Sequence, residues 1–198
     1  MKKLVLASSN AGKLAELQPL LADAGYALVT QRELGLSDAI EDGRSFVENA
    51  LIKARHAARA TGMPALADDS GICVDALDGA PGLYAARYAG THGDTAANNA
   101  RLLRELDGVP AGRRTAYFIA VLVLLRHADD PAPLIAEGRW HGRILDAPRG
   151  AGGFGYDPLF LPDGFDVSAA ELDFALKNRL SHRGQALDLL KARLAGFA

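Results

Sequence analysis

The sequence predicts an α/β protein built on a mixed sheet. Two observations predict this class: short apolar runs alternate with segments of helical periodicity, and two strand-like runs in the second half follow each other across a short polar connection. The alternation favours parallel strands, whereas the consecutive runs favour an antiparallel pair. The chain of 198 residues contains no internal repeat or low-complexity linker, so we expect a single domain over 1–198.

Composition narrows the class of protein. Apolar residues make up 49% and charged residues 23%, as in an ordinary globular protein, and a net charge of −2 gives no basic footprint for nucleic acid. Cys73 is the only cysteine, which excludes an intrachain disulfide and a thiolate metal cluster. The first apolar run is too short for a signal peptide, and Phe118 to Leu125 is too short to span a bilayer. We therefore expect a cytoplasmic protein that binds no membrane.

The first third of the chain alternates strand and helix. Leucines at helical spacing between Leu14 and Leu21 predict a helix, and Gly25 is placed to end it. A second helix begins at Ser45, because Ser45 and Glu48 form a capping box. The predicted elements are a strand over 3–8, a helix over 13–24, a strand over 26–30, a loop over 37–44 and a helix over 46–60.

The remaining elements follow from apolar runs and caps. Asp94 is a helix cap, and the glycines and prolines of 79–93 predict a loop. The predicted elements are strands over 65–67 and 72–76, a helix over 95–106, strands over 115–126 and 134–140, a glycine-rich loop over 150–155 and a helix over 183–194.

Two segments near the N-terminus could carry chemistry. The turn from Ser8 to Lys13 opens a helix, where backbone N–H groups and a lysine favour an anion, although a plain polar cap explains it equally well. Its spacing is not that of a P-loop. Asp68 and Asp69 follow an apolar strand and point in opposite directions, so one could bind a cation or activate water; the alternative is an acidic turn.

Two further segments lie near the C-terminus. Phe154 and Tyr156, separated by glycine, could offer a ring as a stacking platform or could plug the core. His182 and Arg183 open the last helix against its dipole, which indicates that they face an anionic or electron-rich ligand. The other histidines show no ligand spacing, which argues against zinc. Together these parts describe a site for a nucleotide.

The motifs resemble, as an ordered set, those of the inosine triphosphate pyrophosphatase family, the dITP/XTP pyrophosphohydrolases. The resemblance runs from about Lys3 to Leu190. It rests on Ser8-x-Asn10-x-x-Lys13, Ser45-Phe46-x-Glu48-Asn49-Ala50 with Lys53-Ala54, Ala67-Asp68-Asp69-Ser70-Gly71, Pro81-Gly82, Ala86-Arg87-Tyr88, Phe154-Gly155-Tyr156-Asp157-Pro158 and Ser181-His182-Arg183.

The resemblance implies Mg²⁺-dependent hydrolysis of ITP, dITP and XTP to the monophosphate and pyrophosphate, in a homodimer. It also implies an elongated mixed sheet with two lobes around a central cleft. Asp69 is then the general base and a metal ligand, and Glu41 is the second metal ligand. The implied triphosphate-binding residues are Ser8, Ser9, Asn10, Ala11, Gly12, Lys13 and Lys53. The implied nucleoside-binding residues are Ser70, Phe154, Gly155, Tyr156, Asp157, Lys177, His182 and Arg183.

The base would be selected at its 6-position. Arg183 and backbone N–H groups can pair with a 6-oxo group but not with the 6-amino group of adenine. Phe174, Tyr117 and Ile119 depart from the family pattern, which bears on substrate range. Two alternatives are a pyrophosphatase for pyrimidine or modified nucleotides and a nucleotide-binding regulatory module without turnover.

Overall fold

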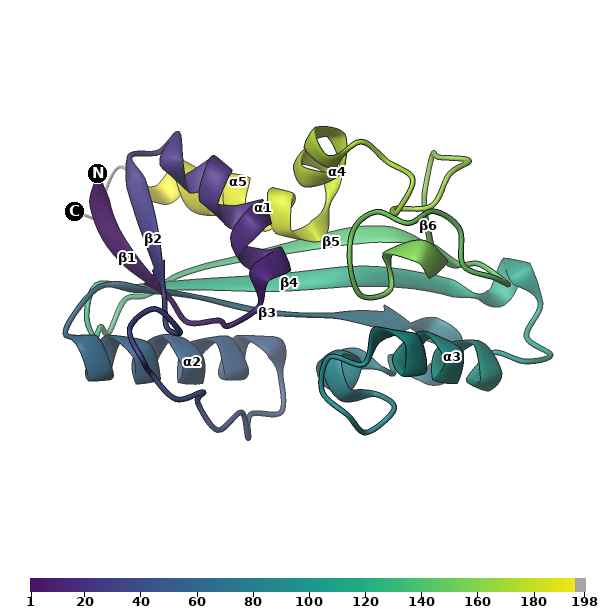
Figure 1. Ribbon diagram of the computed structural model, residues 1–198, viewed down its shortest axis with the longest axis horizontal. Helices are drawn as coiled ribbons and strands as arrows, with labels where there is room; N and C mark the ends of the chain where they lie inside the picture. The colour runs from purple at the N-terminus through teal and green to yellow at the C-terminus, as the bar shows by residue number, and fades with distance from the viewer. Residues whose placement is uncertain (195–198) are drawn as a thin grey trace. The chain divides into compact units, whose positions relative to one another are not determined.

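The computed structural model describes residues 1–194, in which six strands form one sheet of order β2-β1-β3-β4-β5-β6 (Figure 1). β1 pairs parallel with both β2 and β3, whereas β5 pairs antiparallel with β6. The predicted α/β class with a mixed sheet is therefore confirmed. The strands are β1 (Lys2–Leu6), β2 (Tyr26–Thr30), β3 (Ala65–Val74), β4 (Thr115–Leu125), β5 (Leu134–Ile144) and β6 (Phe160–Pro162).

Helices and short 3₁₀ turns connect the strands. The α-helices are α1 (Ala11–Ala22), α2 (Phe46–Thr61), α3 (Thr95–Glu105), α4 (Phe174–Leu180) and α5 (His182–Leu194). The 3₁₀ helices are η1 (Asp75–Leu77), η2 (Gly82–Arg87), η3 (Ala111–Arg113) and η4 (Asp157–Leu159). Among the described residues, no helix is long and apolar enough to cross a membrane.

The chain divides into two compact units, each made of several segments. Unit 1 comprises residues 1–69, 120–138 and 183–194, and unit 2 comprises 70–119 and 139–182. The chain therefore passes between the units four times, after Asp69, Ile119, Gly138 and His182. The first and the last of these passages fall inside motifs identified in the sequence.

In unit 1, α1 and α5 lie on one side of the strands and α2 lies on the other (Figure 1). Leu17 and Leu21 of α1 pack with Leu187 and Leu190 of α5 over Leu122 of β4, all of them fully buried. Since burying a leucine contributes about 1.5–3 kcal/mol, this core fixes the ends of β1 and β3.

Unit 2 has its own core around Phe118, Trp140 and Phe160. The ring of Phe118 meets Phe160 edge-on at 4.7 Å between centroids, and Trp140 lies 5.4 Å from Phe160. Leu102 and Leu106, from α3 and its C-terminal end, complete the core. The unit therefore holds its loops on a packed base of strands and one helix.

The cap signals in the sequence predicted the helix starts well. Ser45 is the N-cap of α2 and Asp94 that of α3, and the side chain of each accepts a backbone N–H. Gly62, at a positive φ of 66°, ends α2. The predicted start of the first helix was late, because Asn10 is the cap and the helix begins at Ala11.

The prediction for the Asp68–Asp69 region was wrong in one respect. The two short strands predicted over 65–67 and 72–76 are one strand, β3, so the acids lie inside a strand rather than in a turn after one. Polar residues at both positions interrupted the apolar run, although their side chains are buried by partners from elsewhere in the chain. α4 and β6 were missed, since each is shorter than the periodic signal that identifies a helix or strand.

Candidate active site

Two parallel strands bring the first predicted site residues together. β1 and β3 pair with Leu6 opposite Leu66, so the residues that follow each lie at one edge of the sheet. The turn 8–13 therefore meets Asp68. The Lys13 Nζ donates to the Asp68 carbonyl oxygen at 3.0 Å and lies 2.6 Å from its Oδ1.

Asp68 is fully buried and lies at the centre of an ion-pair network. Its Oδ2 accepts from the Nε of Arg183 at 2.6 Å, and the Nη1 of Arg183 donates to Glu16. Burial alone would raise the pKa of Asp68, but Arg183 and Lys13 outweigh it and hold that pKa well below its usual range. Asp68 is therefore an ionised anchor for two cations.

The network shows which groups the Arg183 side chain contacts in this structure. The sequence predicted an anionic or electron-rich ligand at its side chain, and the structure supplies two of the protein's own carboxylates, Asp68 and Glu16. Its Nε and Nη1 donors are therefore committed inside unit 1. The helix dipole argument predicted a ligand at Arg183 and did not foresee these two carboxylates; the ligand stays a prediction.

Asp69, Lys53 and Glu41 form a second group beside the first. The Lys53 Nζ lies 2.6 Å from the Oδ1 of Asp69 and 3.2 Å from the Oε2 of Glu41, and it donates to the Asp68 carbonyl oxygen at 3.0 Å. Burial raises the pKa of Asp69, and the Lys53 ammonium only partly offsets this. Burial lowers the pKa of Lys53, but Asp69 and Glu41 outweigh it and raise that pKa. Asp69 is thus a desolvated carboxyl next to a cation.

The two lysines converge on a single atom, the carbonyl oxygen of Asp68. Burial lowers the pKa of Lys13, and the neighbouring Lys53 lowers it further. Two ammonium groups so close repel each other, and the carboxylates of Asp68, Asp69 and Glu41 offset that repulsion as their ion-pair partners.

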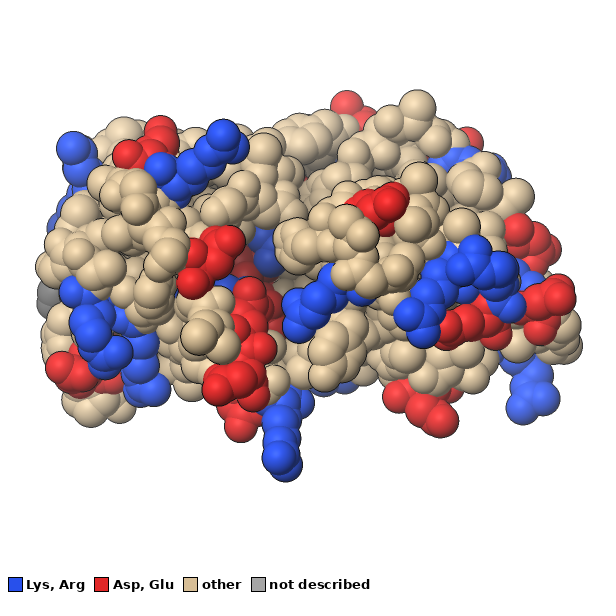
Figure 2. Space-filling view, turned by 60° about the horizontal axis from the view of Figure 1, so that its bottom comes forward, with Lys and Arg blue, Asp and Glu red and all other residues tan. Residues whose placement is uncertain are grey.

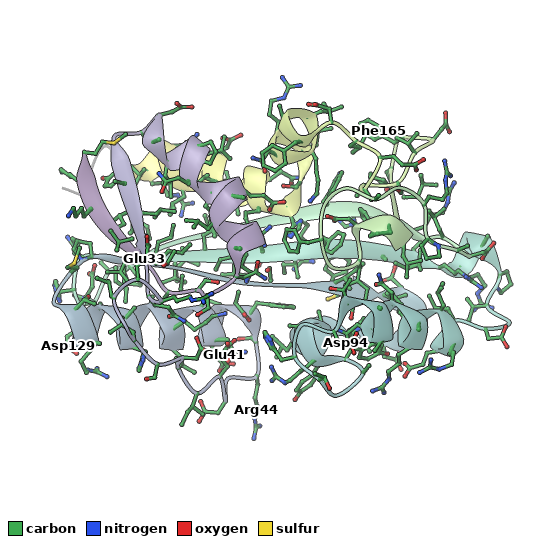
Figure 3. The ribbon with its side chains drawn as sticks, in the orientation of Figure 1. Glu33, Glu41, Arg44, Asp94, Asp129 and Phe165 are labelled. Atoms are coloured by element: carbon green, nitrogen blue, oxygen red, sulfur yellow. The ribbon has the colours of Figure 1, made fainter. Side chains whose placement is uncertain are left out.

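Glu41 comes from the loop before α2. Figure 3 shows it near the N-terminal end of that helix, whereas Arg44 points away from it. In Figure 2, a run of acidic side chains lies left of centre, and further acidic side chains lie among basic ones at the right. The network has four carboxylates against three cations: Glu16, Glu41, Asp68 and Asp69 against Lys13, Lys53 and Arg183.

The donors at this group fit a hard divalent cation. Glu41 and Asp69 offer carboxylate oxygens, and both converge on the same Lys53 ammonium. Among residues 1–194, no cluster of three or more His, Cys, Asp or Glu could enclose a metal alone. Two carboxylates can hold such a cation when water completes its shell.

The turn 8–13 is a polar cap in the structure. The Oδ1 of Asn10 accepts from the backbone N–H groups of Gly12 and Lys13, and the Oγ of Ser8 accepts from the N–H of Asn10. The Oγ of Ser9 donates to Asp38 at 3.3 Å. These bonds fix the turn beside Asp68, which is compatible with either alternative that the sequence left open.

The glycine-rich loop of unit 2 separates the two predicted aromatics. Phe154 is 37% exposed, whereas Tyr156 is 5% exposed and donates its hydroxyl to the Ala85 carbonyl at 2.8 Å. One ring is thus available for stacking and the other plugs the core. Gly153 must be glycine, because its φ is 69° and a Cβ there would lie 2.1 Å from the Oδ2 of Asp157.

Asp157 and Lys177 support the loop. They form a buried ion pair at 2.7 Å; Asp157 also accepts from the N–H of Phe154 at 2.8 Å, and the Lys177 Nζ lies 5.1 Å from the Phe154 ring centroid. The His182 ring stacks on Phe118 at 4.9 Å with an interplanar angle of 11°. Asp157 therefore holds the backbone of Phe154, and Lys177 lies near its ring.

Comparison with known proteins identifies the family. The model of the Ham1 family matches residues 4–193. This chain belongs to the Ham1 family. The resemblance stated from the motifs is confirmed.

Three Ham1 relatives illustrate how close the similarity is. The chain is 63% identical over 194 residues to the dITP/XTP pyrophosphatase of Xanthomonas oryzae pv. oryzae, covering 98% of each chain. It is 59% identical over 197 residues to the dITP/XTP pyrophosphatase of Xylella fastidiosa, covering 100% of this chain and 99% of that one. The structure of a HAM1 protein from Coxiella burnetii matches with a TM-score of 0.90 and 48% identity, covering 98% of this chain and 99% of that one.

Sequence reasoning missed several residues that shape this Ham1 site. Glu16 is a lone acid on the apolar side of α1, a signal that it needs a buried cation, but Arg183 lies 167 positions away. Gln31 and Asp38 bond to the 8–13 turn without any motif to indicate it. Asn99 donates to the Gly155 carbonyl at 3.1 Å and so supports the Phe154 loop.

Proposed function

We propose that this chain hydrolyses deaminated purine nucleoside triphosphates, ITP, dITP and XTP, to the monophosphate and pyrophosphate. One observation carries the proposal: Lys13 and Lys53 converge on the Asp68 carbonyl next to Asp69 and Glu41. The full-length similarity to proteins named dITP/XTP pyrophosphatase supports the substrate class. Removing such nucleotides would prevent their incorporation into nucleic acids.

Asp69 is the proposed general base. Water attacks the α-phosphorus, Asp69 accepts its proton, and the bond to the oxygen that bridges the α- and β-phosphates breaks to release pyrophosphate. A carboxylate within reach of the attacking water supplies the base. Lys53, 2.6 Å away, orients it and stays charged.

Glu41 and Asp69 are the proposed metal ligands. Mg²⁺ would offset the charge that builds on the phosphate oxygens when it is bound. Lys13 and Lys53 add positive charge on the side of the triphosphate, and the capped turn from Ser8 to Lys13 supports them. No covalent intermediate is needed, because positioning and charge neutralisation account for most of phosphoryl-transfer catalysis.

The base is proposed to stack on Phe154, whose ring is held by Lys177 and Asp157. Selection by a 6-oxo group stays a prediction. With its Nε and Nη1 committed to carboxylates, Arg183 is proposed to act mainly by fixing Asp68 and hence Lys13. If Arg183 also reads the base, Arg183→Ala narrows the ratio of ITP to ATP turnover; an unchanged ratio removes it from that role.

Pyrophosphate release tests the function directly. ITP, XTP, GTP, ATP and dTTP would each be assayed with Mg²⁺ and with EDTA. We expect fast, Mg²⁺-dependent release from ITP and XTP and little from the others. Activity on dTTP instead would indicate a pyrimidine-directed pyrophosphatase, and ITP binding without release would indicate a regulatory module.

The cytoplasmic location and the homodimer stay predictions. Cell fractionation tests the first and light scattering tests the second.

A further inference from the structure

The segment that carries Glu41 has no regular structure of its own. Residues 36–44, here called the acidic loop, lie in neither helix nor strand. Glu41 is partly exposed, and its neighbour Ile40 is 83% exposed, so the tip of this loop has little packing. Its position must therefore come from side chains that bind its two ends.

The first end of the acidic loop is tied to the 8–13 turn and to α2. The buried Gln31 donates its Nε2 to the Asp38 carboxylate and lies within hydrogen-bond distance, 3.1 Å, of the Ser9 Oγ. The His56 Nε2 lies 2.8 Å from the Ser37 carbonyl oxygen. These contacts fix the entry to the loop.

The second end is held by Asn49, from inside. Its Oδ1 accepts from the N–H of Gly43 at 2.9 Å, and its side chain is 5% exposed. The fit leaves no room: a Cβ on Gly43 would lie 2.6 Å from that Oδ1 and 2.8 Å from the Glu48 Cβ.

Asn49 also has a fixed relation to Lys53. The two residues are four apart on α2, so they lie on the same face of the helix one turn apart. That face thus presents one side chain that holds the loop at Gly43 and another that pairs with Glu41, two residues earlier. Because Glu41 is only two residues from Gly43, a shift of Gly43 carries Glu41 with it. Lys53 contacts both Glu41 and Asp69, so such a shift changes the position of Glu41 relative to Asp69.

We propose that Asn49 is a positioning residue for the metal subsite. Its bond to Gly43 sets where Glu41 stands relative to Asp69, and it thereby sets the affinity for the divalent cation. The inference rests on the proposed function, in which these two carboxylates bind the metal. Side chains that orient metal ligands in this way typically contribute about 10- to 100-fold in metal affinity.

The test compares three variants of the full chain with the unaltered chain. Asn49→Leu removes the acceptor at similar volume. Gly43→Ala leaves residue 49 unchanged, but its added Cβ pushes the loop away from the Asn49 Oδ1. The double variant combines both changes. Thr61→Ala is the control, because it removes hydrogen bonds at the other end of the same helix, to Ala57 and Met63. Mn²⁺ binding is measured by electron paramagnetic resonance of the free ion, without nucleotide, and the melting temperature is recorded for each.

We expect each single variant to weaken Mn²⁺ binding by about 10- to 100-fold. The double variant should bind Mn²⁺ no more weakly than whichever single variant binds it more weakly. The reason is that both substitutions break the same hydrogen bond, from the Gly43 N–H to the Asn49 Oδ1. In turnover of ITP, the Mg²⁺ concentration for half-activation should rise while kcat at saturating Mg²⁺ changes little. Thr61→Ala should lower only the melting temperature.

Some results overturn the inference and leave the function standing. One is normal Mn²⁺ affinity in Asn49→Leu while the unaltered chain hydrolyses ITP. The inference would also be overturned if the losses in Mn²⁺ affinity add up in the double variant, or if Thr61→Ala loses as much Mn²⁺ affinity as Asn49→Leu. It would be overturned as well if the unaltered chain does not bind Mn²⁺. Failure of the unaltered chain to release pyrophosphate from any nucleotide would instead refute the proposed function, and Mn²⁺ binding would still test Asn49.

Discussion

Replacing Arg183 by methionine tests the buried network most directly. The Arg183 side chain is 2% exposed and bonds Asp68 and Glu16, both buried. Methionine keeps much of the side-chain volume. It removes the Arg183 cation from both carboxylates, while Asp68 keeps its ion pair with Lys13. Breaking a buried ion pair from one side costs about 3–5 kcal/mol. For a chain of this size that corresponds to a fall of about 6–20 °C in melting temperature.

The loss should depend on pH. The pKa of Asp68 is held low in the folded chain, so its contribution to stability is present above its unfolded pKa of about 3.9. It is lost as the pH falls through the lower, folded value. Methionine removes much of that contribution. The difference in unfolding free energy between the unaltered chain and the variant should therefore be largest above about pH 4 and narrow as the pH falls below that value.

Urea unfolding followed by circular dichroism, at about pH 7.5 and about pH 3, measures this difference. Arg193→Met is the control, since Arg193 lies on the same helix, is exposed and donates to the Ile135 carbonyl at 3.0 Å. It should cost no more than about 1 kcal/mol. An Arg183→Met protein as stable as the control at pH 7.5 would refute the network argument. If that variant does not fold, Glu16→Gln, which keeps an acceptor, should fold with a loss of about 1–3 kcal/mol.

Three other predictions concern single side chains. Asp69→Asn should still bind ITP but lose about 10²- to 10⁴-fold in kcat, the usual contribution of a general base; a near-normal kcat would exclude that role. Phe154→Ala should raise the KM for ITP by roughly 5- to 150-fold, because the base loses its stacking partner. Tyr84→Ala, which removes another exposed ring of unit 2, should leave the KM unchanged. Equal KM values for the two variants would contradict the role of Phe154 as a stacking platform. Asp130→Asn should lower stability by about 1–3 kcal/mol at pH 7, because the buried Asp130 carboxylate accepts from Arg126 and from two backbone N–H groups. Arg126 holds the pKa of Asp130 low, so this loss, measured by thermal melts, should shrink as the pH falls below about 4, and a constant loss would contradict it.

The site residues fall into two groups whose supports lie within their own units. The lysines and acids near Asp68 are fixed by α1, α2 and α5 in unit 1, and Phe154 is fixed by Asp157 and Lys177 in unit 2. Asp69 and Ser70 are chain neighbours that belong to different units. Substitutions in one group can therefore be tested for stability effects without removing the supports of the other.

The sequence alone determined what depends on neighbouring residues. Ser45 with Glu48 predicted the start of α2, Asp94 that of α3, and the apolar run 26–30 predicted β2 with its observed bounds. Such signals are reliable because caps and periodicity act over one or two turns. The ordered motifs also predicted the family, which the full-length match confirmed.

Only the tertiary structure decided how distant charges combine. Arg183 reaches Asp68 across 115 positions and Glu16 across 167, and no local pattern specifies such a pair. Those partners let a strand contain two buried acids, so β3 runs without a break where the sequence predicted two strands. Burial likewise assigned Phe154 to the surface and Tyr156 to the core, a choice that two aromatics in one glycine-rich motif leave open. The physical reason is common to all three: the cost of burying a charge or exposing a ring depends on groups that only folding brings within a few ångströms.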